Sequence, residues 1–361
     1  MTGLLVTGLR HRFGAREVVS GLSLSVGPGE LHCLLGPSGC GKTTTLRLIA
    51  GLEPVQQGSI AIAGETVAGP EGDLPPERRR VGLMFQDFAL FPHLSARANV
   101  MFGMDGASAA KRRRADALLS RVGLSERASA YPATLSGGEQ QRAALVRALA
   151  TEPRLMLLDE PFSNLDAHLR EQVRAQVVAI LAEAGTPTVM VTHDPEEALR
   201  VATRVHVMQE GRITQSGTPA ELYARPATPF VAGLFGPLNR VSGLVAEGRV
   251  ETPFGPVPVP GLGDGDPVDV VLRPDALRLQ PADGSAQAVM RVRTIRDTGP
   301  VHWLELDPAD GPVFMARVPS SQPGPRGIGE AVGIAVDPSQ IFVYPRLRGG
   351  MAPARSNGVA P

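Results

Sequence analysis

The fold of this chain is decided by the stretch Gly36-Pro37-Ser38-Gly39-Cys40-Gly41-Lys42-Thr43. It matches the pattern G-x-x-x-x-G-K-[S/T], in which glycines let backbone N–H groups crowd around phosphate oxygens. The apolar run 31–35 before it predicts a buried strand, and residues 44–50 after it predict a helix ended by Gly51. Since a helix N-terminus adds partial positive charge, this strand, loop and helix predict a binding site for nucleotide phosphates.

Two side chains of the loop have expected roles in that site. Lys42 is expected to reach the β- and γ-phosphates, and the Thr43 hydroxyl to ligate Mg²⁺. The alternative is a Gly-rich turn without a ligand. Of 36 Lys and Arg residues only Lys42 and Lys111 are lysines, so arginine serves almost everywhere else. Lysine at this position therefore favours a slender point charge inside a phosphate nest.

Length and composition limit the classes of protein to which the chain can belong. At 361 residues we expect two or three domains, and 43% apolar with 20% charged residues is ordinary for a soluble globular protein. The formal net charge is zero, so we expect no nucleic-acid partner. The sequence shows neither an apolar run of roughly 18 residues nor a basic-then-apolar leader, so we expect it to remain in the cytosol. Cys33 and Cys40 form no disulfide framework or zinc motif.

Three further apolar runs end in polar residues. Gln86 follows 81–85, Asp159 and Glu160 follow 155–158, and His193 follows 188–192. The carboxyl ends of strands in such a sheet lie beside the ligand. We therefore expect Asp159 to hold Mg²⁺, Glu160 to orient and deprotonate water, and Gln86 to touch the ligand. His193 is either structural or, at the end of a strand in the same sheet, in contact with phosphate.

Phe13 and Ser136 each allow two interpretations. Phe13 is either a core or edge side chain or a stacking platform for an adenine ring. Ser136 and Glu139 form a capping box that predicts a helix start at this point. The cap needs no further function, but Gly137 and Gly138 expose a row of backbone donors that would make a second anion site.

The composition and the hydrophobic periodicity of the sequence change near residue 235. Residues 95–152 are dominated by helical patterns, with a basic run at 111–114 that reads as a solvated helix face. Past 235, Gly and Pro are dense and short alternating strands recur, which predicts a small β-barrel or sandwich. Residues 346–361 are rich in Arg, Gly, Pro and Ser and predict a disordered tail.

Taken together, these motifs resemble those of the ATP-binding-cassette ATPases over residues 1–235. In family order, Gly36–Thr43 resembles Walker A, Gln86 the Q-loop, Leu135–Glu139 the signature, Leu155–Glu160 Walker B, Ser163–Asp166 the D-loop and His193 the switch histidine. Two positions depart from the pattern. The signature more often has Gln where this chain has Glu139, and the adenine-stacking position is often Tyr or Trp where this chain has Phe13.

The resemblance implies an α/β P-loop NTPase with a RecA-like core, a helical subdomain at about 87–157, and a small all-β barrel of the OB or TOBE type at 236–345. It implies ATP and Mg²⁺ as cofactors, with catalysis by Glu160, His193 and Gln86 and metal contacts from Thr43, Gln86 and Asp159. The implied nucleotide contacts are Phe13, Gly36, Pro37, Ser38, Gly39, Cys40, Gly41, Lys42, Thr43, Thr44, Ser136, Gly137, Gly138, Asp159 and Asp166. The signature residues would come from a second copy of the chain, so that two ATP molecules are sandwiched in a head-to-tail dimer.

The last third is similar to the extra β-domain of importer ATPases, and the segments 74–82, 85–93 and 160–166 look most like those of ferric-iron importers. This implies a peripheral subunit at the cytoplasmic face of a bacterial inner membrane. Its partners would be permease subunits, which Phe88, Leu90 and Phe91 would contact, and indirectly a solute-binding protein. The alternatives are an importer ATPase for polyamine or another small solute or anion, a regulator whose β-domain senses cargo, and a soluble ATPase that acts on ribosomes or DNA.

Overall fold

The computed structural model describes residues 2–163, 165, 167–283, 286–322, 324–325 and 327–346, without the side chains of 167–169. The chain divides into two compact units, and the second begins at Tyr223. The segment after Tyr223 packs with the β part, since Arg273 Nη2 donates to the Tyr223 carbonyl at 2.9 Å and the Tyr344 hydroxyl to the Pro226 carbonyl at 3.0 Å. Of the predicted tail only Arg346 lies within the described residues.

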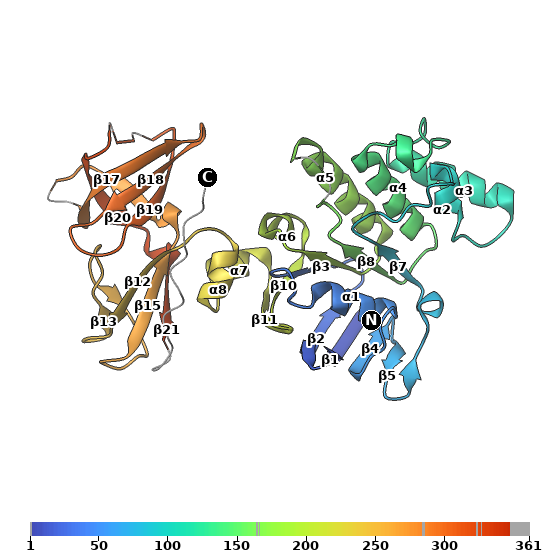
Figure 1. Cartoon of the computed structure of the whole chain (residues 1–361), viewed down its shortest axis with the longest axis horizontal. Coiled ribbons are helices and arrows are strands. Elements are labelled where there is room, and N and C mark those ends of the chain that lie inside the picture. The colour runs from blue at the N-terminus through green and yellow to red at the C-terminus, as the bar shows by residue number, and fades with distance from the viewer. Residues whose placement is uncertain are drawn as a thin grey trace. The chain divides into compact units, whose positions relative to one another are not determined.

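A six-stranded sheet forms the centre of the first unit as described (Figure 1). Its order is β11 (Arg212–Gly217), β10 (Arg204–Gln209), β3 (Leu31–Leu35), β9 (Thr188–Thr192), β8 (Leu155–Asp159), β7 (Val81–Met84). All neighbours are parallel except β10 and β11. Every residue of β3 and β9 is buried, which is why the sequence shows them as continuous apolar runs. Their carboxyl ends therefore meet at one edge of the sheet.

Helix α1 (Lys42–Ala50) begins directly after the loop and packs between this sheet and a second one. The second sheet is antiparallel, with the order β2 (Arg16–Val26), β1 (Leu4–Phe13), β4 (Gln57–Ile62), β5 (Glu65–Gly69), β6 (Gly72–Asp73). Leu46, Leu48 and Ile49 of α1 share one apolar core with residues of both sheets. The start of α1 is thus held rigidly from two sides, as a phosphate-binding helix requires.

The other helices of the first unit lie on the opposite face of the parallel sheet (Figure 1). They are α2 (Ala96–Met101), α3 (Ser108–Arg121), α4 (Gly137–Leu149), α5 (Ala167–Ala184) and α6 (Pro195–Val201), with the single turn η2 (Pro132–Thr134). The single turn η1 (Pro76–Arg78) lies instead beside the end of α1. The predicted capping box at Ser136 is present at the start of α4, and Asp194 caps α6. None of the helices that the structure describes is long and apolar enough to cross a membrane.

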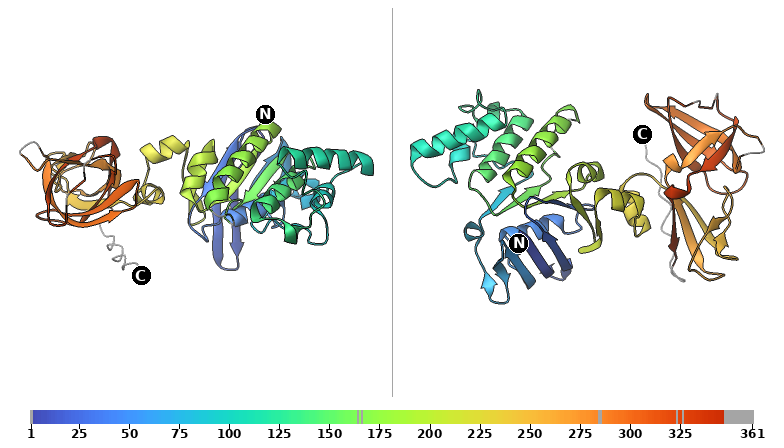
Figure 2. Two further views of the ribbon diagram at one scale, coloured as in Figure 1. Left: turned by 90° about the horizontal axis from the view of Figure 1, so that it is seen from above. Right: turned by 180° about the vertical axis from the view of Figure 1, so that it is seen from behind.

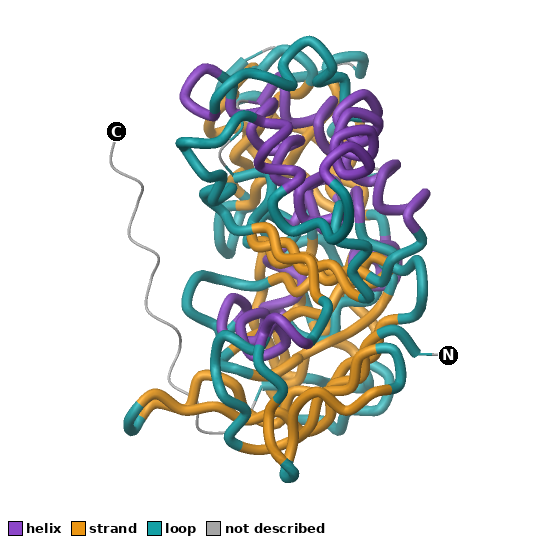
Figure 3. Tube along the Cα trace, turned by 90° about the vertical axis from the view of Figure 1, so that its right-hand side faces the viewer, coloured by secondary structure: helices purple, strands orange, loops and turns teal. Residues whose placement is uncertain are grey.

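The second unit is built mainly from strands around one apolar core (Figures 2 and 3). Its described sheets are β12 (Asn239–Leu244), β15 (Pro267–Leu272), β21 (Ile341–Pro345); β13 (Arg249–Val250), β14 (Val257–Pro258); and β16 (Leu277–Gln280), β20 (Ala331–Val336), β17 (Ala288–Asp297), β18 (Val301–Asp307), β19 (Phe314–Pro319). The short elements α7 (Pro219–Ala224), α8 (Pro229–Leu234), η3 (Pro274–Ala276) and η4 (Pro338–Gln340) complete the chain. The barrel-like all-β domain predicted from the sequence is therefore confirmed.

Candidate functional site

The loop between β3 and α1 requires glycine for steric reasons. A Cβ atom on Gly36 would lie 2.3 Å from the Met208 carbonyl oxygen, and one on Gly41 would lie 2.4 Å from the Val18 carbonyl oxygen. Gly41 also has a φ of 104°, in the left-handed region. The loop is therefore packed so closely against β2 and β10 that only hydrogen fits, and its N–H groups stay in place.

The Lys42 side chain is buried and folds over its own loop. Its Nζ donates to the carbonyl oxygens of Gly36 at 2.6 Å and Pro37 at 3.0 Å. The ammonium group is thus held at the mouth of the loop by two neutral acceptors. Since phosphate oxygens carry charge, they would be stronger acceptors for the same group.

Thr43 and Asp159 meet although they are far apart in the sequence. Thr43 Oγ1 donates to Asp159 Oδ1 at 3.2 Å, because α1 begins beside the end of β8. Burial raises the pKa of Asp159, and the hydrogen bond from Thr43 opposes that rise. A cation beside this carboxylate would compensate the cost of burying its charge.

Glu160 and His193 form the second pair at this edge. Glu160 follows β8 with a φ of 46°, and its backbone N–H donates to the Val191 carbonyl of β9 at 2.9 Å. Its Oε1 lies 2.9 Å from His193 Nδ1. The Glu160 side chain is 17% exposed and that of His193 is 53% exposed. Two groups able to carry a proton are therefore connected at the rim of the site.

Phe13 lies at the end of β1 with 49% of its surface exposed. Its ring meets the ring of buried His11 edge to face, at a centroid distance of 4.6 Å. A core role for Phe13 is therefore wrong. An exposed aromatic face of this kind is available for stacking.

The remaining predicted residues lie further from the loop in the chain's own fold. Gln86 follows β7, two strands from β9 in the sheet. The Ser136 hydroxyl accepts from the Glu139 N–H at 3.3 Å at the start of α4, with Gly137 and Gly138 in its first turn. Asn164 and Asp166 lie outside the described residues.

Gly211 supports the loop and was not predicted from the sequence. Its backbone N–H donates to the Cys40 carbonyl at 3.1 Å, and a Cβ there would lie 2.7 Å from the Val18 carbonyl oxygen. The Glu-Gly turn between β10 and β11 was the available signal. Nothing local indicates that this turn packs behind the loop.

The chain is similar to known families and proteins. The family model described as ABC transporter matches residues 19–163, and the TOBE domain model matches residues 270–343. The Fe(3+) ions import ATP-binding protein FbpC of Streptomyces avermitilis is 42% identical over 92% of this chain and 95% of its own length. The sulfate/thiosulfate import ATP-binding protein CysA of Bordetella bronchiseptica is 41% identical over 94% and 98%.

A solved structure resembles the first part of the fold. It is the dimeric structure of the ATP-binding cassette MJ0796 in a post-hydrolysis state with ADP and Pi, with a TM-score of 0.53 and 30% sequence identity. The match covers 60% of this chain and 98% of that chain. Both relatives match nearly end to end at more than 40% identity. The chain therefore belongs to the ATP-binding proteins of the ABC transporter family and carries a TOBE domain in its second unit.

Proposed function

We propose that this chain is the ATP-hydrolysing subunit of an importer, in which ATP binding and hydrolysis drive solute uptake through a membrane permease. One observation carries the proposal. The loop 36–43, Asp159, Glu160 and His193 come from separate parts of the sequence and meet at one edge of one parallel sheet. Phosphoryl transfer to water needs hydrogen-bond donors for the phosphate oxygens, a pair of oxygen ligands for a cation and a carboxylate base.

The residues present fit Mg²⁺. Neighbouring ligands of an octahedral Mg²⁺ lie about 3 Å apart, and Thr43 Oγ1 and Asp159 Oδ1 are 3.2 Å apart. These two would hold the ion, with Gln86 as a third contact. When bound, the ion neutralises charge on the β- and γ-phosphates. The chain itself supplies the Lys42 ammonium group, which exchanges its two loop carbonyls for phosphate oxygens.

Glu160 acts as the base for the attacking water in this proposal. Its contact with His193 keeps the carboxylate at the rim of the sheet, where the γ-phosphate would end. Glu160 takes a proton of the water as the water oxygen bonds to the γ-phosphorus. The bond from that phosphorus to the β–γ bridging oxygen breaks, and ADP leaves with its electron pair. His193 holds the carboxylate and approaches the γ-phosphate with its exposed edge.

A second copy of the chain completes each site. Ser136, Gly137 and Gly138 present the N-terminus of the 13-residue helix α4, yet their hydrogen bonds in this chain stay within the helix turn. The same donors on a second chain would close on the γ-phosphate. That the cassette MJ0796 is dimeric with ADP and Pi supports this arrangement.

The surface for the permease differs from the one expected from the sequence. Phe88 is 5% exposed and cannot serve in docking. Its carbonyl accepts from Arg147 Nη2 at 3.1 Å, so it anchors the segment after Gln86. Phe102 is 63% exposed, and its ring contacts that of Phe91 at a centroid distance of 4.4 Å and a tilt of 44°, so these two rings form the apolar surface instead.

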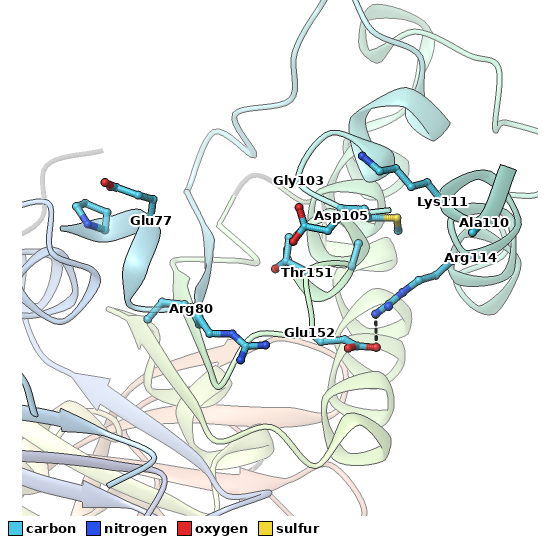
Figure 4. A pocket seen from close by; sticks show the side chains of 13 residues that line it. Glu77, Arg80, Gly103, Asp105, Ala110, Lys111, Arg114, Thr151 and Glu152 are labelled. Carbon is cyan, nitrogen blue, oxygen red and sulfur yellow. Dashed lines mark ion pairs between the residues drawn. The ribbon is translucent and has the colours of Figure 1, made fainter. Parts of the chain in front are cut away.

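A cleft of about 690 Å³ includes Gly103, the residue directly after Phe102, in its lining (Figure 4). Its lining runs from η1 and the start of β7 to the segment after Phe102, α3 and the end of α4. Arg114 and Glu152 form an ion pair of 2.7 Å in its lining, and Lys111 and Asp105 also line it. We propose that a short cytoplasmic helix of the permease docks here, with apolar residues on the rings and polar ones on these charges.

The proposed cargo is ferric iron, and the proposed location is the cytoplasmic face of the inner membrane, where the permease holds the chain. A solute-binding protein would deliver the cargo to the permease. The relative of Streptomyces avermitilis named for Fe(3+) supports iron. The relative named for sulfate and thiosulfate is almost as similar and makes an anion the second candidate.

The hydrolytic function is tested by Glu160→Gln. The amide keeps the size of the side chain but cannot take a proton, so we expect ATP to bind and turnover to fall by roughly 10²–10⁴-fold. With the γ-phosphate retained, the variant should form a dimer with ATP and Mg²⁺ in size-exclusion chromatography. The control Glu196→Gln removes an exposed carboxylate that pairs with Arg200 and should behave as wild type. A Glu160→Gln chain that hydrolyses ATP normally would refute the proposed base.

The cargo is tested in cells that lack the gene. We expect uptake of radiolabelled ferric iron to fall and growth to fail under iron limitation, while sulfate uptake is unchanged. A loss of sulfate uptake with normal iron uptake would assign the second candidate. Unchanged uptake of both, in a strain without redundant systems, would refute the proposed transport of these two solutes.

A further inference from the structure

The hairpin that carries Phe13 also carries Arg16, which the proposed ATP site does not use. Phe13 and Arg16 are the last residue pair between β1 and β2, separated only by the turn at 14–15. Directly opposed residues of an antiparallel pair project from the same face. Arg16 therefore lies beside the exposed ring that the proposed site uses for adenine.

The Arg16 side chain extends from this hairpin toward the phosphate-binding loop. A Cβ atom built on Gly39 would lie 3.9 Å from Arg16 Nη2 and near no other described atom within 4 Å. Gly39, with a φ of 79°, is at the centre of the loop. The guanidinium group thus stands between the ring at Phe13 and the loop, where the ribose and the first phosphates of a nucleotide would pass.

The neighbouring cations are engaged, whereas Arg16 is exposed. Arg10 pairs with Glu17 at 3.0 Å, Arg12 donates to the Ala15 carbonyl at 2.9 Å, and Lys42 is bound to its loop carbonyls. The Arg16 side chain forms no hydrogen bond or ion pair with another residue that the structure describes. A guanidinium group presents several donors in a planar fork that matches phosphate oxygens.

We infer that Arg16 is a further nucleotide-binding residue, whose guanidinium group binds the α- and β-phosphates of the bound nucleotide. The inference rests on the proposed ATP site, because Phe13 and the loop set the position of the nucleotide. ATP and ADP share these two phosphates. Arg16 therefore stabilises ground state and transition state alike, which changes Kd and KM but leaves kcat unchanged.

The test measures nucleotide binding and turnover by the full chain with Arg16→Ala, Arg16→Lys and the control Arg12→Ala. The control removes the same charge from β1, the other strand of the hairpin, at a position next to Phe13 and therefore on the opposite face of the sheet. We expect Arg16→Ala to raise Kd for ATP and for ADP about tenfold, the size of one charge-assisted contact at an exposed site. Binding of adenosine and kcat at saturating ATP should not change, and Arg16→Lys should recover part of the loss.

Each result separates the inference from its alternatives. Equal ATP affinities for Arg16→Ala and Arg12→Ala would overturn it, because Arg16 is then only a solvated side chain. A parallel loss of adenosine affinity would also overturn it, since the residue would then support the ring site. A wild-type chain that binds no ATP would instead refute the proposed function.

Discussion

The stability of the cassette should depend strongly on Arg79, the most deeply buried arginine in contact with α1. Its side chain is 2% exposed. Nη1 donates to the carbonyl oxygens of Leu48 at 2.8 Å and Ile49 at 3.1 Å, and Nε donates to that of Leu74 at 2.7 Å. A cation at a helix C-terminus also interacts favourably with the helix dipole. Arg79 therefore caps the C-terminal carbonyl groups of α1, the helix that begins at the phosphate-binding loop.

Arg79→Met keeps most of the buried volume and removes all three hydrogen bonds. A hydrogen bond from a charged donor contributes about 1.5–3 kcal/mol. Burial of the guanidinium group lowers its pKa, so part of the gain is offset by a desolvation cost that methionine avoids. We expect the free energy of unfolding to fall by about 3 kcal/mol, and Tm by about 6–12 °C for a unit of this size. Gly51→Ala should act on the same contact, since its Cβ would lie 2.5 Å from Arg79 Nε.

Far-UV circular dichroism and tryptophan fluorescence distinguish the unfolding of the first unit from that of the second. The single tryptophan, Trp303, lies in β18 of the second unit, whereas helices α1 to α6 lie in the first. Urea unfolding followed by far-UV circular dichroism should shift to lower urea in Arg79→Met, while the Trp303 fluorescence curve stays in place. The control Arg78→Met changes an exposed neighbour and should leave both curves unchanged. Equal dichroism midpoints for Arg79→Met and wild type would refute the reasoning.

Further expectations concern the loop, the permease, the second unit and pH. Lys42→Ala should remove most ATP binding, and Lys42→Arg should also impair it because a wider fork replaces a slender ammonium group; near-normal turnover in either would contradict the site. Phe102→Asp should abolish co-purification with the permease while nucleotide binding is kept, and an unaffected pull-down would place docking elsewhere. A chain ending after residue 224 should remain soluble and bind ATP, because the second unit begins at Tyr223; an insoluble fragment would show that the units depend on each other. Burial lowers the pKa of His206 to about 3, so between pH 6.5 and 5 only the unfolded chain takes up this proton, and the free energy of unfolding should fall by about 2 kcal/mol. Thermal melts over this pH range should show a smaller fall for His206→Gln than for wild type. An equal fall in both proteins would contradict the pKa shift.

Much of the nucleotide site follows from the sequence because its signals are local. Glycines at 36, 39 and 41 reflect backbone geometry and space that only glycine allows. Continuous apolar runs indicate strands buried on both faces, and a Ser-x-x-Glu pattern indicates a helix start at Ser136. Strands β16 and β21 of the second unit give no such signal, because their residues do not alternate regularly between buried and exposed.

What the tertiary structure decided concerns partners far apart in the chain. Whether Phe88 faces the core or solvent depends on Arg147, which lies on α4 and holds the backbone of that segment. The contact between Glu160 and His193 exists because β8 and β9 are neighbours in the sheet, and the role of Arg79 exists because η1 lies against the end of α1. A sequence pattern specifies the conformation of a segment and which face is apolar, but sheet order and packing determine which distant side chains meet.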